Sequence, residues 1–179
     1  MKKAIVTGAN GFIGTALCRE LTARGVPVIA IVRNEEEKIG DIEHLPGLRI
    51  AYCDMKRFAQ LADVISDRDA DVLYHLAWAG SAGPMRGDSA VQMSNIQAAC
   101  DTVRACAALS CKRFVFASSI MEYEIAALME TEAAPGINTL YSSAKVAADY
   151  MARTLACANG IDYIRAVISN IYGPGEVSP

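Results

Sequence analysis

The sequence predicts an α/β fold built on a doubly wound parallel sheet. Short runs of β-branched residues alternate with longer segments of helical periodicity along the whole chain. Most of these runs are apolar throughout, which is typical of strands covered on both faces. Because connections between parallel strands are right-handed, this alternation places helices on both sides of one sheet.

The expected elements follow in order from the first residues. Strands are expected at six positions, which are residues 4–6, 28–32, 48–52, 72–76, 114–116 and 163–168. Helices are expected at four positions, which are residues 12–24, 58–66, 89–109 and 140–159. In the first helix Ile13, Leu17 and Leu21 recur at helical spacing, and Gly25 is placed to end it. We expect residues 1–179 to form one domain.

Composition and charge limit the classes of partner that the chain is expected to bind. The chain has 179 residues, of which 53% are hydrophobic, and its net charge of -3 argues against nucleic acid. No apolar stretch approaches the roughly 18 residues of a membrane helix, and no signal peptide is recognisable. The six cysteines form no CxxC pair and are interpreted as reduced, mostly buried thiols, and no metal site is expected. We therefore expect a cytoplasmic protein.

A glycine-rich loop lies between the first expected strand and the first expected helix. Gly8 permits a tight turn, Gly11 lets the backbone approach a pyrophosphate, and Gly14 lets the helix pack closely on the sheet. The N-terminus of the helix offers free amide donors and the positive end of a dipole. The segment therefore predicts a dinucleotide site, which also includes Asn10, Phe12 and Ile13.

The spacing of this loop is GxxGxxG, and its Asn10–Gly14 run resembles that of the extended short-chain dehydrogenase/reductase family. This family contains NAD(P)-dependent epimerases, dehydratases and reductases of sugar nucleotides, and the resemblance covers the whole chain. It implies a Rossmann fold with a smaller C-terminal substrate domain. The chain ends in a loop after its last expected strand, so we expect the Rossmann domain to be incomplete and the substrate domain largely missing.

The end of the second strand bears on the choice between NAD and NADP. An acidic residue there usually binds the ribose 2′-hydroxyl of NAD, but the sequence has Val32 followed by Arg33. An arginine can pair with a 2′-phosphate, so we expect NADP(H) to be preferred over NAD(H). An exposed arginine that only solvates the strand end is the alternative. Asp54, with Met55 beside it, resembles the family's adenine-binding aspartate, although a solvated loop aspartate is also possible.

Tyr141 and Lys145 have the spacing of a catalytic pair. At positions i and i+4 they lie on one face of a helix, where the lysine cation favours the phenolate form of the tyrosine. The strand that precedes this helix ends in Ser119, which resembles the family's serine that binds the reacting oxygen of the substrate. The resemblance therefore assigns Ser119, Tyr141 and Lys145 as the catalytic residues, with Lys145 also binding the nicotinamide ribose.

The resemblance also implies other contacts in the cleft. Leu76, Ala77 and Trp78, at the end of the fourth strand and just after it, are expected to line the cofactor site, and Asn95 is expected to steady the nearby backbone. Asn95 on a helix surface without such a role is the alternative. The expected substrate contacts are Ser119, Glu122 and, in the loop after the sixth strand, Asn170.

The residues after Ser119 bear on the reaction. Dehydratases of this family have an Asp-Glu pair there, whereas this sequence has Ile120 and Met121, so dehydration is disfavoured. Epimerisation and ketoreduction of a nucleotide-activated sugar remain, and deoxysugar 4-ketoreductases look most similar. The rival hypothesis is a non-catalytic NADP(H)-binding sensor or interaction module. Relatives often form homodimers through helices such as residues 89–109 and 140–159.

Overall fold

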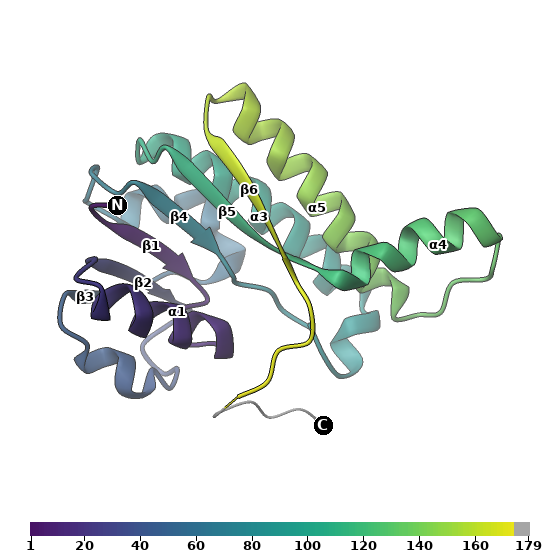
Figure 1. Cartoon of the computed structure of the whole chain (residues 1–179), viewed down its shortest axis with the longest axis horizontal. Coiled ribbons are helices and arrows are strands. Elements are labelled where there is room, and N and C mark those ends of the chain that lie inside the picture. Colours follow the sequence, from purple (N-terminus) through teal and green to yellow (C-terminus); the bar gives the residue numbers. More distant parts are fainter. Residues whose placement is uncertain (174–179) are drawn as a thin grey trace.

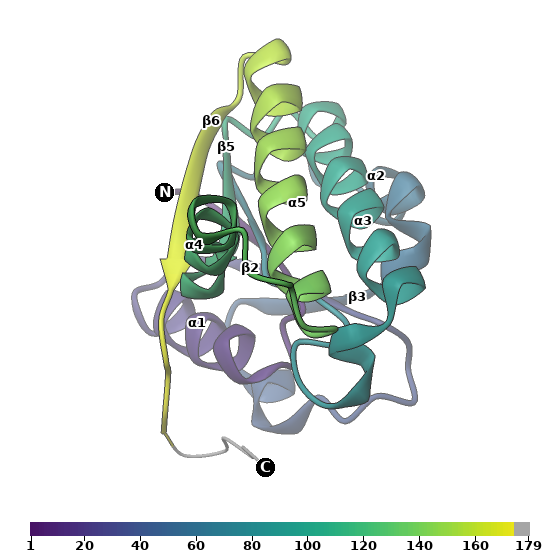
Figure 2. The same cartoon turned by 90° about the vertical axis from the view of Figure 1, so that its right-hand side faces the viewer.

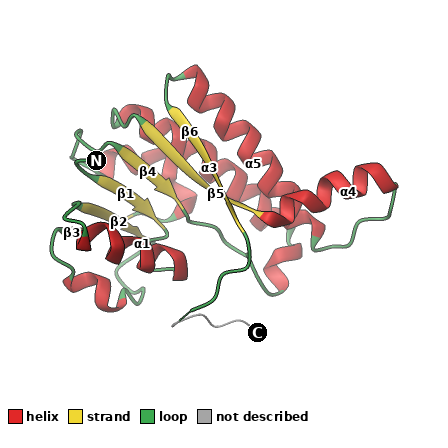
Figure 3. Ribbon diagram, in the orientation of Figure 1, coloured by secondary structure: helices red, strands yellow, loops and turns green. Residues whose placement is uncertain are grey.

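A computed structural model describes residues 1–173 of the chain, in which six parallel strands form one sheet (Figures 1 and 3). The strands are β1 (Ala4–Thr7), β2 (Val28–Val32), β3 (Leu48–Tyr52), β4 (Val72–His75), β5 (Arg113–Ser119) and β6 (Asp162–Ile168). Their order in the sheet is β3-β2-β1-β4-β5-β6. This order confirms the predicted doubly wound fold, and all six predicted strands are present.

The helices lie between these strands in the sequence. The α-helices are α1 (Phe12–Ala23), α2 (Leu61–Val64), α3 (Ser89–Ala108), α4 (Tyr123–Thr131) and α5 (Thr139–Ala158). Short 3-10 helices are η1 (Gly40–His44), η2 (Met55–Gln60), η3 (Pro84–Gly87) and η4 (Ile120–Glu122). Three of the four predicted helices therefore match to within one residue at each end.

The connection order creates a crevice above β1 and β4. β1 pairs with β2 on one side and with β4 on the other. The strands β2 and β3 are therefore added on one side of β1, and β4, β5 and β6 are added on its other side. At such a switch point the loops that follow the two strands diverge and leave room for a ligand. The glycine-rich loop after β1 and the segment after β4 meet at this place.

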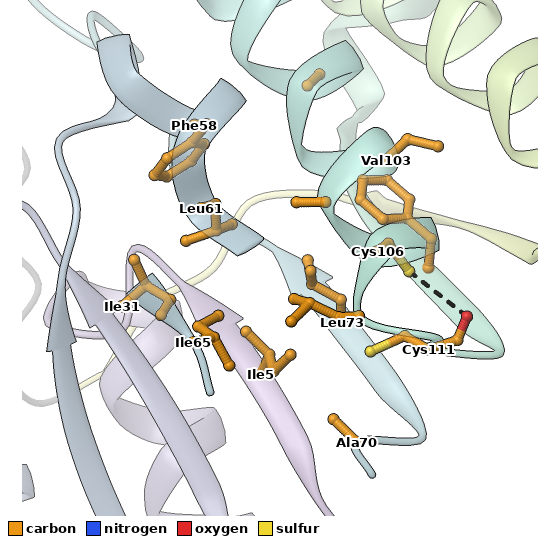
Figure 4. Packing of buried hydrophobic residues seen from close by; sticks show 14 of the residues in the cluster. Ile5, Ile31, Phe58, Leu61, Ile65, Ala70, Leu73, Val103, Cys106 and Cys111 are labelled. Atoms are coloured by element: carbon orange, nitrogen blue, oxygen red, sulfur yellow. Dashed lines mark hydrogen bonds between the residues drawn. The ribbon is translucent and has the colours of Figure 1, made fainter. Parts of the chain in front are cut away.

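The core lies on both sides of the central strands. On one side α2, α3 and α5 cover the sheet, and α3 and α5 run side by side (Figure 2). Ile5 and Leu73 of the sheet pack there with Phe58 and Val103, as Figure 4 shows. On the other side α1 packs through Cys18 and Leu21 on β1 and β2. Apolar strands of this kind are stable only when both faces are covered.

Coverage of both faces does not extend across the whole sheet within residues 1–173. Ile164 of the edge strand β6 is 42% exposed, and Val167 is 41% exposed. The prediction of a fully covered sheet was therefore wrong for the described part of β6. Five of the six cysteines are buried, and Cys157 is exposed. None of the described helices is both long enough and apolar enough to cross a bilayer.

The helix predicted at residues 58–66 is much shorter than expected. Asp54 caps η2 by accepting from the backbone N–H of Lys56, and a kink at Arg57 (φ -116°, ψ 16°) interrupts it. Only the single turn of α2 follows, and Ile65 is already extended. The apolar residues Phe58, Leu61 and Ile65 are all buried, so their pattern marks a packed face rather than a continuous helix.

Helix α4 was not predicted. It projects from the body of the molecule (Figure 1), and none of its residues is buried. A helix without a buried face leaves no amphipathic pattern in the sequence. Its Ala, Leu, Met and Glu residues, which are strong helix formers, are the signal that could have found it.

Candidate active site

The glycine-rich loop requires glycine at two positions for steric reasons. Gly8 has φ +65°, and a Cβ atom there would lie 2.9 Å from the backbone nitrogen of Ala77. At Gly14 a Cβ atom would overlap the carbonyl oxygen of Gly8 and approach the Cα of Ala9 to 2.8 Å. Gly8 therefore lets the β1 and β4 loops touch, and Gly14 lets α1 start directly on the loop.

Gly11 is less tightly enclosed, because a Cβ atom there would meet only the carbonyl oxygen of Gly8, at 3.2 Å. It is exposed and extended at the N-cap of α1, and no side chain caps the helix. The first-turn residues Phe12 and Ile13 line the neighbouring cleft together with the glycines. An uncapped helix N-terminus beside a bare backbone is the arrangement that binds a diphosphate. The cradle therefore fits a dinucleotide.

A cleft of about 370 Å³ opens over the carboxyl ends of β1, β4, β5 and β6. The predicted site residues that line it are Gly8, Gly11, Phe12, Ile13, Gly14, Leu76, Trp78, Ser119, Tyr141 and Lys145. The structure therefore brings the predicted catalytic residues and most of the predicted glycine loop to one cavity. Ile171, in the loop expected to carry substrate contacts, lines it too, and the lining residues that were not predicted are Ser81, Ala117, Ser118, Ile168 and Ser169.

Lys145 lies beneath this cleft. Its Nζ donates to the carbonyl oxygen of Ala117 at 2.8 Å and sits 3.7 Å from the ring centroid of Trp78. The residue is only 5% exposed. Burial lowers the pKa of Lys145 to about 7, and the carboxylate of Glu122 opposes that shift. Near neutral pH the amine and the ammonium forms are therefore both populated.

Tyr141 lies between an aromatic ring and a cation. Its ring meets Trp78 edge to face with centroids 6.1 Å apart, and the guanidinium of Arg86 lies 4.3 Å from its centroid. Arg86 also donates to the carbonyl oxygen of Ser81. Sequence reasoning missed Arg86, because a single arginine in the 84–87 turn carries no pattern of its own. A cation over the phenol ring makes this end of the cleft favourable for an anion.

Ser119 is held at the junction of β5 and η4. Its Oγ accepts from the backbone N–H of Met121, and its own N–H donates to the Glu122 carboxylate. This reciprocal pair is a capping box, and it fixes both the strand end and the start of η4. Only 3% of the Glu122 side chain is exposed. The expected substrate contact of Glu122 therefore requires the carboxylate to leave its protein partners.

Two buried amides on α3 support the loop after β4. Asn95 donates to and accepts from the backbone of Ala79, at 2.8 and 2.9 Å. Gln92 Nε2 lies within hydrogen-bond distance of three carbonyl oxygens, those of Gly80, Met85 and Arg86. Trp78 Nε1 donates to Gln92 Oε1. Gln92 was not predicted, although its place one turn before Asn95 puts both on one helix face.

The remaining predicted residues do not line the cleft. Asn10 donates to the carbonyl oxygen of Lys38, and the exposed Arg33 pairs with Glu37 at 3.1 Å. Asp54 caps η2, and Met55 packs at the edge of the core. Asn170 is exposed between Ser169 and Ile171, which do line the cleft. Pro174, which belongs to the loop predicted after the sixth strand, lies outside the described residues.

His75, at the end of β4, is enclosed below the site. Its Nδ1 lies 3.2 Å from Thr7 Oγ1, and its ring packs against Phe58, Phe114 and Phe116. Burial, and secondarily the Lys145 cation, lower the pKa of His75 to about 3. Its ring is therefore neutral at every pH at which Lys145 titrates.

The sheet order, the glycine cradle at its switch point and the adjacent cleft define a Rossmann fold of the dinucleotide-binding type. A model of the NAD-dependent epimerase/dehydratase family matches residues 4–179, and the chain belongs to this family. The resemblance inferred from the glycine loop and the Ser119, Tyr141 and Lys145 pattern is thus confirmed at the level of the family.

Individual relatives match over part of their length. The 2-alkyl-3-oxoalkanoate reductase of Shewanella oneidensis is 28% identical over 116 residues, 65% of this chain and 28% of that protein. The dTDP-6-deoxy-L-talose 4-dehydrogenase (NAD(+)) of Aggregatibacter actinomycetemcomitans is 38% identical over 76 residues, 41% of this chain and 26% of that protein.

A solved structure shows the same fold. UDP-glucose 4-epimerase from Thermotoga maritima, solved with UDP-glucose, superposes with a TM-score of 0.77 at 20% identity. The superposition covers 96% of this chain and 57% of that one. The chain thus spans about a quarter of the two sequence relatives and little more than half of the epimerase.

Proposed function

We propose that this chain carries the cofactor site and catalytic residues of an NAD(P)-dependent enzyme that acts on a nucleotide-activated sugar. The reaction is hydride transfer at a keto or hydroxyl carbon, in an epimerase or a ketoreductase. The observation that carries the proposal is the convergence of Ser119, Tyr141 and Lys145 on one cleft with the glycine cradle. A non-catalytic sensor needs the cradle but not these three residues.

Each catalytic side chain has a distinct task. When bound, the nicotinamide gives or takes the hydride. Tyr141 moves a proton to or from the oxygen of the reacting carbon, and Ser119 hydrogen-bonds that oxygen. The Lys145 ammonium, one helical turn from Tyr141, stabilises the phenolate that forms when the proton leaves.

The substrate class is supported from two directions. The names of two relatives refer to a dTDP-activated or a UDP-activated sugar. In this structure the guanidinium of Arg86 lies over the ring of Tyr141, which lines the cleft, and such a cation would favour the phosphates of a nucleotide-activated sugar. Ile120 and Met121, which follow Ser119, supply no acid or base for dehydration.

The function is tested by oxidation of NADPH and NADH in the presence of a panel of nucleotide-activated 4-ketosugars. We expect turnover with at least one member, or exchange of the C4 configuration of a nucleotide sugar when NAD is bound. A 2-alkyl-3-oxoalkanoate is included because one relative bears that name. Turnover of the oxoalkanoate alone would contradict the sugar assignment, and no turnover with any compound would favour the sensor.

We further propose that NADP(H) is preferred over NAD(H). Val32 ends β2 inside the core and carries no carboxylate to bind a ribose 2′-hydroxyl. Arg33 follows it with 64% of its side chain exposed, so its guanidinium is accessible to a 2′-phosphate. The ion pair of Arg33 with Glu37 is exposed and therefore weak, which leaves the guanidinium free to exchange partners.

The expected effect of Arg33→Ala is a roughly tenfold loss of affinity for NADPH with little change for NADH, because one charge-assisted contact is removed. Binding is measured by cofactor fluorescence. Arg24→Ala is the matched control, since Arg24 also forms an exposed pair with a glutamate four residues away. Equal losses for both cofactors, or none, would disprove the preference.

A second copy of the chain is the proposed protein partner. α3 and α5 run side by side, and they expose the apolar residues Met93, Tyr150 and Met151. Two such helix pairs would bury these residues in a four-helix interface.

A further inference from the structure

A cluster of charged side chains lies behind the catalytic residues. The carboxylates of Glu122 and Asp149 both bind Arg165, whose Nη2 lies 2.5 Å from Glu122 Oε2 and whose Nε lies 3.2 Å from Asp149 Oδ2. Tyr163 donates its hydroxyl to Asp149 at 2.5 Å. The side chains of Glu122 and Asp149 are only 3% and 7% exposed. None of these groups was predicted to interact.

Glu122 connects this cluster to the end of β5. Its Oε1 accepts from the Ser118 hydroxyl at 2.5 Å and from the Ser119 N–H at 3.2 Å. The preceding residue, Ala117, accepts the hydrogen bond of Lys145 through its carbonyl oxygen. Three consecutive residues of one strand are therefore held by Glu122 on η4 and by Lys145 on α5.

The charges of the cluster balance only when Lys145 is included. Two buried carboxylates face one guanidinium, which leaves one negative charge. A buried charge without a counter-charge is costly, and the Lys145 ammonium supplies the missing positive charge. The carboxylate of Glu122 raises the pKa of Lys145 against the lowering effect of burial.

We propose that Glu122 is a positioning residue of the active site, which supplies the counter-charge for the Lys145 ammonium and fixes the strand end that carries Ser119. Its importance for catalysis rests on the proposed function, but its effect on Lys145 does not. Arg165 in turn holds the carboxylate of Glu122 in place from β6.

A pH transition near 7 can be assigned to Lys145 when the other titratable groups around it are considered. Tyr141 and Asp149 lie one turn before and after it on α5, and His75 ends β4 below it. The pKa of His75, about 3, removes that ring from the neutral range. Asp149 binds Arg165 and accepts the hydroxyl hydrogen bond of Tyr163. Lys145 is therefore the group of this cluster expected to change charge near pH 7.

The fluorescence of Trp78 provides a probe of the charge on Lys145. It is the single tryptophan of the chain, and its ring centroid lies 3.7 Å from Lys145 Nζ. An ammonium over an indole face interacts with its π-system, whereas a neutral amine does so far less. Trp78 emission is therefore expected to change with a midpoint near pH 7, without any cofactor or substrate.

The experiment is a fluorescence pH titration of the cofactor-free chain and its variants. Lys145→Met is expected to abolish the transition. Glu122→Gln, which removes the charge at nearly constant volume, is expected to lower the midpoint by roughly one pH unit, because the ammonium loses its counter-charge. A variant that only loosened the packing would admit water, favour the ammonium and raise the midpoint. A lowered midpoint therefore indicates that the ammonium has lost its counter-charge, whereas a raised midpoint indicates loosened packing.

Glu124→Gln is the matched control. Glu124 lies two residues further on and accepts from the hydroxyls of Thr139 and Ser142, but it does not bind Arg165. The midpoint of the Glu124→Gln variant is expected to equal that of the wild type. If Glu122→Gln does not fold, Glu122→Met removes the same charge and leaves Arg165 paired with Asp149. An unchanged or raised midpoint in the Glu122 variant, or a transition that persists in Lys145→Met, would overturn the proposal.

Discussion

Replacing Tyr141 by phenylalanine is expected to reduce turnover about 1,000-fold, within the range that a general acid or base contributes. The hydroxyl that exchanges the proton is lost, while the ring keeps its edge-to-face contact with Trp78 and its place under Arg86. Stability and cofactor affinity are therefore expected to change little. Turnover is measured by NADPH oxidation with the substrate that the ketosugar panel identifies.

The control for this variant is Tyr74→Phe, which removes a hydroxyl from β4 that lies 4.0 Å from the Met1 sulfur. This variant is expected to retain wild-type turnover. Undiminished turnover in Tyr141→Phe would rule out the proposed proton transfer. A parallel loss of cofactor affinity would mean that the change has disturbed the cleft instead.

Gly14→Ala is expected to lower the free energy of unfolding by about 3 kcal/mol, at the upper end of overpacking effects. The added methyl group would meet the backbone of Gly8 and Ala9, and backbone cannot move aside as a flexible side chain can. For a chain of this size the loss corresponds to a fall in Tm of about 6–12 °C. Thermal unfolding followed by circular dichroism measures it.

Gly136→Ala gives the comparison for this variant. Gly136 is exposed, and a Cβ atom there would meet no other atom within 4 Å. Its Tm is expected to remain within about 2 °C of the wild type, as for ordinary surface substitutions. Equal stability of the two variants would show that the start of α1 can shift away from the Gly8 turn.

The sequence was most informative where function depends on neighbours along the chain. Gly8, Gly11 and Gly14 belong to one turn, and Tyr141 and Lys145 to one helical turn, so their spacing alone predicts their proximity. The short runs of β-branched and apolar residues likewise predict all six strands, because this signal lies in consecutive residues.

Contacts between distant segments were not predictable in this way. Arg165 reaches Glu122 across 43 positions, because the parallel register places it opposite Phe116, in the middle of β5. In the sequence Arg165 is only a polar interruption of an apolar run. Arg86 reaches Tyr141 through a loop whose path depends on Gln92, and a single buried glutamine has no local signature.

The three carbonyl contacts of Gln92 have a thermodynamic consequence for ligand recognition. A loop that must become ordered when its ligand arrives loses conformational entropy, and this loss weakens binding. Here one buried amide already fixes residues 80–86 at several points along the backbone. The segment that carries Arg86 is thus preorganised, and a ligand at the cleft mouth encounters a rigid wall whose selectivity comes from shape and charge.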